Sequence, residues 1–317
     1  MAYSIEEVDK VEILTLQDNF IDMVTQDNSD VIQRAVARKG MEISNSIVAE
    51  HGFSALVTIT CDEKARSLLF DFGFSEDGAA RNAEALNADI QTVEVLALSH
   101  GHLDHVGGIK KIMELTGKSS LDLVLHPWSF VTPRFLKITE EFKVYFPAFT
   151  KEKATEYGVN VVETEDPYPL LDGQALFLGQ IPRLTTYEKG APDLCCEVDG
   201  KEMPDPFHDD TGLVINVKGK GLVVLSGCAH SGIVNTVKHA QQVTGIDVVH
   251  AVMGGFHLSG TDFDTVIKPT TDSLKSIEPD WIVPTHCTGR EVAIYIEKEM
   301  PDQFILNMSG TKLTFQK

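Results

Sequence analysis

Three histidines and one aspartate stand within six positions, from His100 to His105, directly after the apolar stretch 93–98. The apolar stretch predicts a buried strand, so the six residues begin where that strand ends. In an extended loop His100 and His102 face the same way, because side chains alternate with a period of two. Asp104 and His105 stand where the loop turns into the next predicted helix, so four ligating groups can converge on two adjacent metal ions. Imidazole and carboxylate groups suit zinc, iron or manganese, and the cluster therefore predicts a metal centre.

Short apolar runs that favour strands alternate with amphipathic stretches that favour helices in both halves of the chain. The predicted strands are 11–16, 54–60, 67–71, 93–98, 121–125, 213–217, 221–225, 248–253, 281–284 and 312–315. The predicted helices are 78–88, 108–117, 233–243, 264–276 and 292–299. Two strand-rich halves of this kind favour an α/β fold in which two sheets pack together with helices outside, a four-layer αββα sandwich.

The segment from about 126 to 206 has a different composition, rich in proline, aromatic and charged residues. We expect it to be an irregular insertion or lid without a core of its own. The 317 residues are enough to bury one large core. We therefore predict a single domain over residues 1–317 that carries this insertion.

The formal net charge of −20 disfavours nucleic acid as a partner, because tight binding to a phosphate backbone needs clustered lysine and arginine. No apolar run is long enough to cross a bilayer, and the acidic N-terminal segment lacks the basic and apolar regions of a signal peptide. Five cysteines without a CxxC pair make a disulfide framework or a zinc knuckle unlikely. We expect a cytoplasmic protein with a small-molecule partner, and the sequence leaves open whether it forms a homo-oligomer.

Further ligand candidates follow other apolar strands, because ligands of α/β sheets gather beyond the carboxyl ends of strands. These candidates are His126, His230, His257 and His286. Cys228 lies two positions before His230 and is either a metal ligand or a small buried hydrophobe. The remaining histidines stand in polar or mid-element settings and are treated as ordinary; they are His51, His208, His239 and His250.

Four other side chains have candidate roles beside the metal. His257 follows glycines that let the backbone approach a ligand, so we expect it to bind substrate or donate a proton. Asp71 ends a strand and either orients a metal-ligating imidazole or forms a turn. Arg183 offers a bidentate contact to phosphate and Lys189 a point charge, and the alternative for each is an ordinary surface charge.

The HxHxDH cluster, with Asp71 before it and His286 after a late strand, resembles the signature of the metallo-β-lactamase superfamily. The stretches 226–236, 254–258 and 286–289 resemble one subgroup, the 7,8-dihydropterin-6-yl-methyl-4-(β-D-ribofuranosyl)aminobenzene 5′-phosphate synthases. The resemblance implies the metallo-β-lactamase fold over nearly the whole chain. It also implies a divalent metal cofactor, expected as two zinc ions, with iron or manganese as alternatives.

The resemblance further implies a division of the ligands. The first ion would take His100, His102 and His230, and the second ion would take Asp104, His105 and His286. Cys228 stands where the superfamily usually has a bridging aspartate, and Asp209 or Asp210 could compensate. Asp104 and His257 are the predicted catalytic residues, and Arg183 and His257 the predicted substrate contacts.

Three functions fit these residues. The synthase reaction, in which a second substrate attacks a pterin methylene and pyrophosphate leaves, is the leading interpretation by resemblance. A metallohydrolase of a phosphoester or another small molecule is the first alternative, because a bound metal activates water near neutral pH. A metal or ligand sensor without turnover is the second. All three predict a cleft for an anionic or phosphorylated small molecule.

Overall fold

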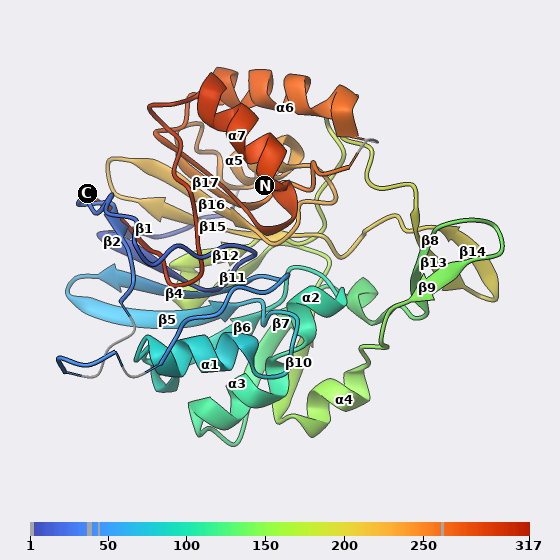
Figure 1. Ribbon diagram of the computed structural model, residues 1–317, viewed down its shortest axis with the longest axis horizontal. Helices are drawn as coiled ribbons and strands as arrows, with labels where there is room; N and C mark the ends of the chain where they lie inside the picture. Colours follow the sequence, from blue (N-terminus) through green and yellow to red (C-terminus); the bar gives the residue numbers. More distant parts are fainter. Residues whose placement is uncertain (1–2, 37–39, 44, 261–262) are drawn as a thin grey trace.

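Two facing sheets with helices on their outer faces make up the body of the protein (Figure 1). The computed structural model describes residues 3–36, 40–43, 45–260 and 263–317. Met1 and Ala2 of the acidic N-terminal segment lie outside the described residues. No described helix combines the length and the hydropathy that crossing a membrane requires.

The first sheet contains eight strands within the described residues, in the order β10-β7-β6-β5-β4-β2-β19-β3. Its strands are β2 (Lys10–Gln17), β3 (Ile32–Gln33), β4 (Ser54–Cys61), β5 (Lys64–Phe70), β6 (Val93–Ala97), β7 (Leu121–Leu125), β10 (Val159–Glu163) and β19 (Lys312–Gln316). β5, β6, β7 and β10 run parallel, so their carboxyl ends meet at one edge.

The second sheet has the order β11-β12-β15-β16-β17-β18, and β1 also pairs with β15. Its strands are β1 (Glu7–Val8), β11 (Tyr168–Leu170), β12 (Ala175–Phe177), β15 (Gly212–Val217), β16 (Gly221–Ser226), β17 (Val249–Gly255) and β18 (Trp281–Thr285). β15 and β16 pair antiparallel as a hairpin. β16, β17 and β18 run parallel, which again brings their carboxyl ends together.

The helices cover the outer faces of the two sheets. α1 (Gly78–Ala85), α3 (Ile109–Thr116) and α4 (Lys151–Glu156) pack on the first sheet, and α5 (Ile233–Thr244), α6 (Asp264–Ile277) and α7 (Arg290–Glu299) on the second. One apolar core lies between the sheets and another lies under each set of helices. Three cores between successive layers define an αββα sandwich, so the predicted fold class is confirmed.

Both faces of the central strands are buried, as β4 illustrates. Ala55 and Val57 point into the core between the sheets, whereas Leu56 points to the helices. Because side chains alternate along a strand, a strand between two apolar layers needs a continuous apolar run. The run 54–60 in the sequence has this pattern.

The segment 126–206 contains more regular structure than its composition predicts. β10 is an edge strand of the first sheet, and β11 and β12 belong to the second sheet. The segment also forms a third sheet, with the order β14-β13-β8-β9. The strands of this third sheet are β8 (Arg134–Lys137), β9 (Lys143–Tyr145), β13 (Leu194–Val198) and β14 (Lys201–Pro204). It protrudes from the body at the right of Figure 1. Its strands are only three to five residues long, which is too short for a clear periodicity among prolines and charges.

Candidate metal centre

The loop that carries the histidine cluster is anchored by the buried carboxylate of Asp71, which follows β5. The backbone N–H and the hydroxyl of Ser99 each donate to this carboxylate over 2.7 Å. The Nδ1–H of His105 also donates to it, over 2.6 Å. The bond at Nδ1 directs the other ring nitrogen of His105 into the site. Asp71 therefore orients the imidazole of His105, which is the first of the two roles that the sequence left open for it.

A second carboxylate, Asp209, holds the middle of the same loop. It accepts from the backbone N–H of Gly101 over 2.9 Å and from both terminal nitrogens of Arg134, over 2.9 and 2.7 Å. The Nε of Arg134 pairs with Asp205 at 2.8 Å. Since Arg134 lies on β8, these buried ion pairs connect the protruding sheet to the metal loop.

The structure brings all seven predicted metal ligands together. Within each of the following groups the ligand atoms lie no more than 4.8 Å apart: Asp104, His105, Cys228 and His286; His100, Cys228 and His230; His100, His102 and Asp104. The donors come from the ends of β6, β16 and β18, so strand ends of both sheets meet at this point. A further group joins Cys228 to His257 and Cys287.

The electrostatics of these groups suit a cation. Burial lowers the pKa of His100 and His230 well below the ordinary value and that of His102 to about 3, so all three imidazoles are neutral. Among the described residues, Nε2 of His100 and both ring nitrogens of His230 have no hydrogen-bond partner. Buried polar atoms without partners are costly. A divalent metal ion would satisfy these nitrogens, and the residues therefore fit the group.

The carboxylate of Asp104 contributes the negative charge. Although burial favours its protonated form, His105 and the bond from His286 outweigh that effect and hold the pKa of Asp104 well below its usual value. Asp104 and Asp71 in turn outweigh burial at His105, whose pKa is raised to about 9. The two carboxylates thus favour positive charge at this point.

His286 is set in place by residues near the N-terminus. Its backbone N–H donates to Asp18 over 2.9 Å, and its Nδ1–H donates to the side-chain oxygen of Asn19 over 3.0 Å. Its Nε2 is then left facing Asp104 at 3.1 Å. The amide nitrogen of Asn19 donates to Nδ1 of His51, and Nε2 of His51 lies 3.3 Å from Asp104.

Four residues around this centre have left-handed backbone angles. The φ values are +60° at Asp71, +54° at Ala229, +44° at His257 and +46° at His286. Such angles cost energy in residues with side chains and persist where the surroundings enforce them, often at functional sites. Here they turn the chain sharply at the ends of β5, β16, β17 and β18.

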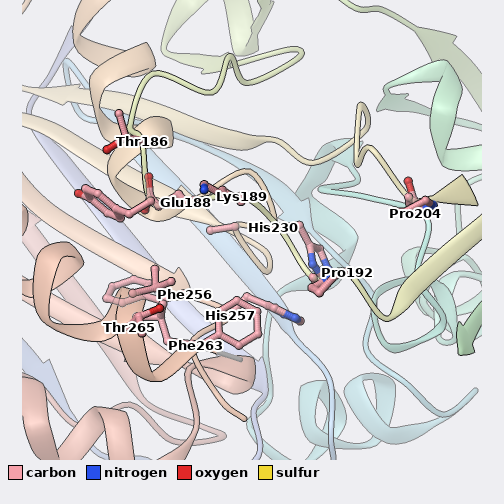
Figure 2. Close-up of a pocket in the computed structure, with 18 residues that line it drawn as sticks. Thr186, Glu188, Lys189, Pro192, Pro204, His230, Phe256, His257, Phe263 and Thr265 are labelled. Atoms are coloured by element: carbon pink, nitrogen blue, oxygen red, sulfur yellow. The ribbon is translucent and has the colours of Figure 1, made fainter. Parts of the chain in front are cut away.

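A cleft of about 600 Å³ opens beside the centre (Figure 2). His230 and His257 belong to both the centre and the cleft wall. Its lining includes Tyr187, Glu188, Lys189, Pro192, Phe256, Leu258, Phe263 and Thr265. In Figure 2 the segment with Glu188 and Lys189 lies opposite Phe256 and Phe263. The wall combines apolar and aromatic side chains with one lysine and two acids, Glu188 and Asp205, which suits a ring system with polar substituents.

Other sequence candidates lie elsewhere. The Arg183 guanidinium donates to the backbone carbonyls of Glu188, His230 and Pro206, so in the structure it fastens the cleft-lining segment 186–192. Nδ1 of His126 accepts from the backbone N–H of Trp128 and starts a short helical turn.

Asp209 and Asp210 were the acids expected to replace the bridging aspartate, and in the structure both carboxylates accept hydrogen bonds from other groups. Asp210 accepts from the backbone N–H groups of His230 and Ser231, over 2.9 and 2.8 Å. Asp209 is held by Arg134 and the backbone of Gly101.

Sequence reasoning missed three residues of this site: His51, Asn19 and Arg134. His51 was treated as ordinary because it follows no apolar strand; it lies in the turn before β4, next to Gly52 with a φ of +142°. Arg134 is an isolated charge whose partners lie 71 and 75 positions away. Local pattern carries no signal for such contacts.

The fold and the converging histidines define a class of metalloenzyme, and the comparisons with known proteins agree. The model of the metallo-beta-lactamase superfamily matches residues 50–286. The chain belongs to this superfamily and is an enzyme of the transferase or hydrolase type, as the sequence predicted. The superfamily typically binds divalent metals.

Two proteins of Methanocaldococcus jannaschii are related to the chain more specifically. A 7,8-dihydropterin-6-methyl-4-(beta-D-ribofuranosyl)-aminobenzene-5′-phosphate synthase is 30% identical over 275 residues, 84% of this chain and 90% of that protein. An uncharacterised protein is 33% identical over 248 residues, 76% of this chain and 85% of that protein.

Solved structures share the fold. A crystal structure described as a metal-dependent hydrolase of the beta-lactamase superfamily has a TM-score of 0.72 and 24% identity, covering 97% of this chain and 100% of that one. YhfI of Bacillus subtilis, a metallo-beta-lactamase fold protein, has a TM-score of 0.52 and 10% identity over the same shares.

Proposed function

We propose that this chain is a two-metal enzyme that joins a pterin to a phosphorylated aminobenzene riboside with release of pyrophosphate. The observation that carries the proposal is the convergence of seven donor residues beside a cleft with an aromatic wall and a lysine. The relation to the synthase of Methanocaldococcus jannaschii supports the choice of substrates. We place the enzyme in the cytoplasm.

Seven residues would hold the ions: His100, His102, Asp104, His105, Cys228, His230 and His286. The resemblance assigns His100, His102 and His230 to one ion and Asp104, His105 and His286 to the other. Two zinc ions suit this donor set, with iron or manganese as alternatives. Bound there, divalent ions supply Lewis acidity that neutralises charge on phosphate oxygens.

The chain's own groups position the reactants. The half-buried ring of Phe263 on the cleft wall would stack on the pterin ring, and Lys189 would attract a phosphate. His257 lies between the cleft and the ligand cluster, so it can hold a proton next to the departing group.

A metallohydrolase is the second candidate. The neutral, partnerless imidazoles of His100 and His230 form the kind of ligand set that hydrolytic metal sites use. On this reading the same cleft binds one phosphoester, and water takes the place of the second substrate.

The test is turnover by the purified enzyme after loading with zinc, iron or manganese in separate arms. The dihydropterin-methyl pyrophosphate and the aminobenzene riboside phosphate are supplied singly and together, and pyrophosphate and the joined product are measured. We expect both to form only when both substrates are present. Cleavage of a generic phosphodiester, with no joined product from the pair, would favour the hydrolase. Full metal without turnover of either would favour the sensor.

Variants separate the centre from the scaffold. His100→Ala and Asp104→Asn should abolish turnover and reduce bound metal. His208→Ala is the matched control, since His208 is half-buried, lies outside the donor groups of the described residues, and contacts Gln180 and the Trp128 ring edge. Equal losses in all three variants would contradict the assignment.

A further inference from the structure

Cys228 lies at the centre of the ligand cluster, and its sulfur is the donor that the separate groups share. Of the four donor groups found in the described part of the chain, three include Cys228. We propose that the Cys228 thiolate is a ligand of both metal ions, so that sulfur bridges the centre where the superfamily's usual bridge is a carboxylate. The inference rests on the proposed two-metal function and specifies the chemistry of its metal centre.

The distances fit a shared position. Sγ of Cys228 lies 3.1 Å from Nε2 of His105, on the side of Asp104 and His286. The same sulfur is within 4.8 Å of the ligand atoms of His100 and His230. Two donors on one tetrahedral zinc lie roughly 3.6 Å apart, given zinc–nitrogen and zinc–sulfur bonds of about 2.1 and 2.3 Å. One sulfur can therefore reach both ions from where it stands.

The residues on either side of Cys228 bring its backbone close to the histidine loop. A Cβ on Gly227 would lie 2.0 Å from the Ser99 hydroxyl and 2.7 Å from a carboxylate oxygen of Asp71, so only glycine lets the loop come this close. Ala229 then takes a left-handed φ of +54°, which turns the chain toward His230. Cys228 itself is only 2% exposed.

Three buried carboxylates beside the centre are occupied by other partners, and Asp104, which belongs to two of the donor groups, is the alternative bridge that the variants below test. Asp71 accepts three hydrogen bonds from Ser99 and His105, and Asp209 accepts from Gly101 and Arg134. Asp210 accepts from two backbone N–H groups. Turning any of them toward the ions would leave these buried donors unpaired, at about 1 to 3 kcal/mol each.

A second thiol stands beside the first. Sγ of Cys287 lies 3.5 Å from the carbonyl oxygen of Cys228, and it forms a donor group with Cys228 and His257. It is therefore the alternative source of any metal–sulfur signal. The experiment must distinguish a shared Cys228 from a terminal Cys287.

The experiment is X-ray absorption at the zinc edge on the full-length protein loaded with two zinc ions. A shared sulfur gives each ion about one sulfur neighbour at about 2.3 Å, whereas a terminal sulfur gives about half a neighbour per ion on average. We expect the higher value. A second readout is the thiolate-to-cobalt charge-transfer absorption after cobalt loading, which should grow with the first ion and again with the second.

Four variants complete the test: Cys228→Ser, Cys228→Asp, Cys287→Ser and the control Cys196→Ser. Cys228→Ser should lose the sulfur neighbour on both ions, and Cys228→Asp should retain two ions without sulfur, because a carboxylate can restore the bridge. Cys196→Ser is the matched control, since Cys196 is buried on β13 outside the donor groups of the described residues.

The proposal is overturned if wild-type protein has about half a sulfur per ion. It is overturned likewise if Cys228→Ser keeps about half a sulfur per ion or more, since Cys287 would then be a terminal ligand. It is also overturned if two-zinc protein has no sulfur neighbour. A sulfur-bridged centre without turnover of the pterin pair would refute the proposed reaction and keep the bridge.

Discussion

Asp71 shows how one side chain outside the ligand set controls the site at the residue scale. It is fully buried and receives three hydrogen bonds, one from the ring of His105. Asp71→Ala should lower the affinity for the ion that His105 binds by about 10- to 100-fold, because the ring loses its orientation. A competition titration against a chromophoric chelator measures this affinity. Asp193→Ala, at an exposed position, is the control, and unchanged affinity in Asp71→Ala would contradict the role.

Gly101 controls the packing of the histidine loop. A Cβ at this position would lie 2.0 Å from the carbonyl oxygen of Ser129, which is backbone and cannot swing away. Gly101→Ala should therefore destabilise the protein by about 1 to 3 kcal/mol through overpacking. Urea unfolding measures the change. Gly219→Asn is a matched control, since its turn has open space and asparagine accepts the left-handed angle; a similar loss there would point to a general glycine effect.

The sequence identified the candidate ligands that converge in the structure better than the residues that position them. The histidines of the cluster and His286 could be found because each follows an apolar strand, and Asp71 because it ends one. His51 and Asn19 could not, since they act on Asp104 and His286 through contacts that exist only after folding. A single polar residue in a turn has many alternative roles.

At the scale of elements, α5 begins without a cap of its own. Its N-cap position is Gly232, and the carboxylate of Glu188 accepts from the N–H groups of Val234 and Asn235 over 2.9 and 3.0 Å. Helix starts need such acceptors. Since Glu188 also lines the cleft, this contact joins the cleft wall to the helix.

Removing that contact should cost stability. Glu188→Ala should lower the free energy of unfolding by about 1 to 3 kcal/mol, because two buried N–H groups lose a charged acceptor. The midpoint of denaturant unfolding measures the effect. Glu188→Gln keeps one acceptor oxygen and should recover part of the loss. If alanine and glutamine behave alike, the capping role is wrong.

Prediction of the elements succeeded where apolar residues dominate the element or recur at helical spacing over several turns. The five-residue run of β7 and the twelve residues of α5 are recognisable from periodicity alone. The short strands of 126–206 are not, because strands such as Lys143–Tyr145 are stabilised by neighbours far along the chain. The prediction of one domain with a lid over this segment stays a prediction.

At the scale of the whole molecule, the proposed metal ions should stabilise the fold. Ions that bind the folded chain but not the unfolded chain add about 2.7 kcal/mol at a hundredfold excess over Kd. Chelation should therefore lower the melting temperature of the wild-type protein, and zinc should restore it. In a His100→Ala, His286→Ala double variant the melting temperature should respond little to either addition. An equal response in both proteins would contradict binding at this centre.

The donors of the centre lie in loops of both sheets, and these loops are far apart in the sequence. The ring of His105 and the sulfur of Cys228 that it touches are 123 positions apart. During synthesis the HxHxDH loop emerges long before the segments that carry Cys228, His230 and His286. High-affinity capture of both ions must consequently wait until the last strands are in place, so metal loading reports on completed folding and cannot guide its early steps.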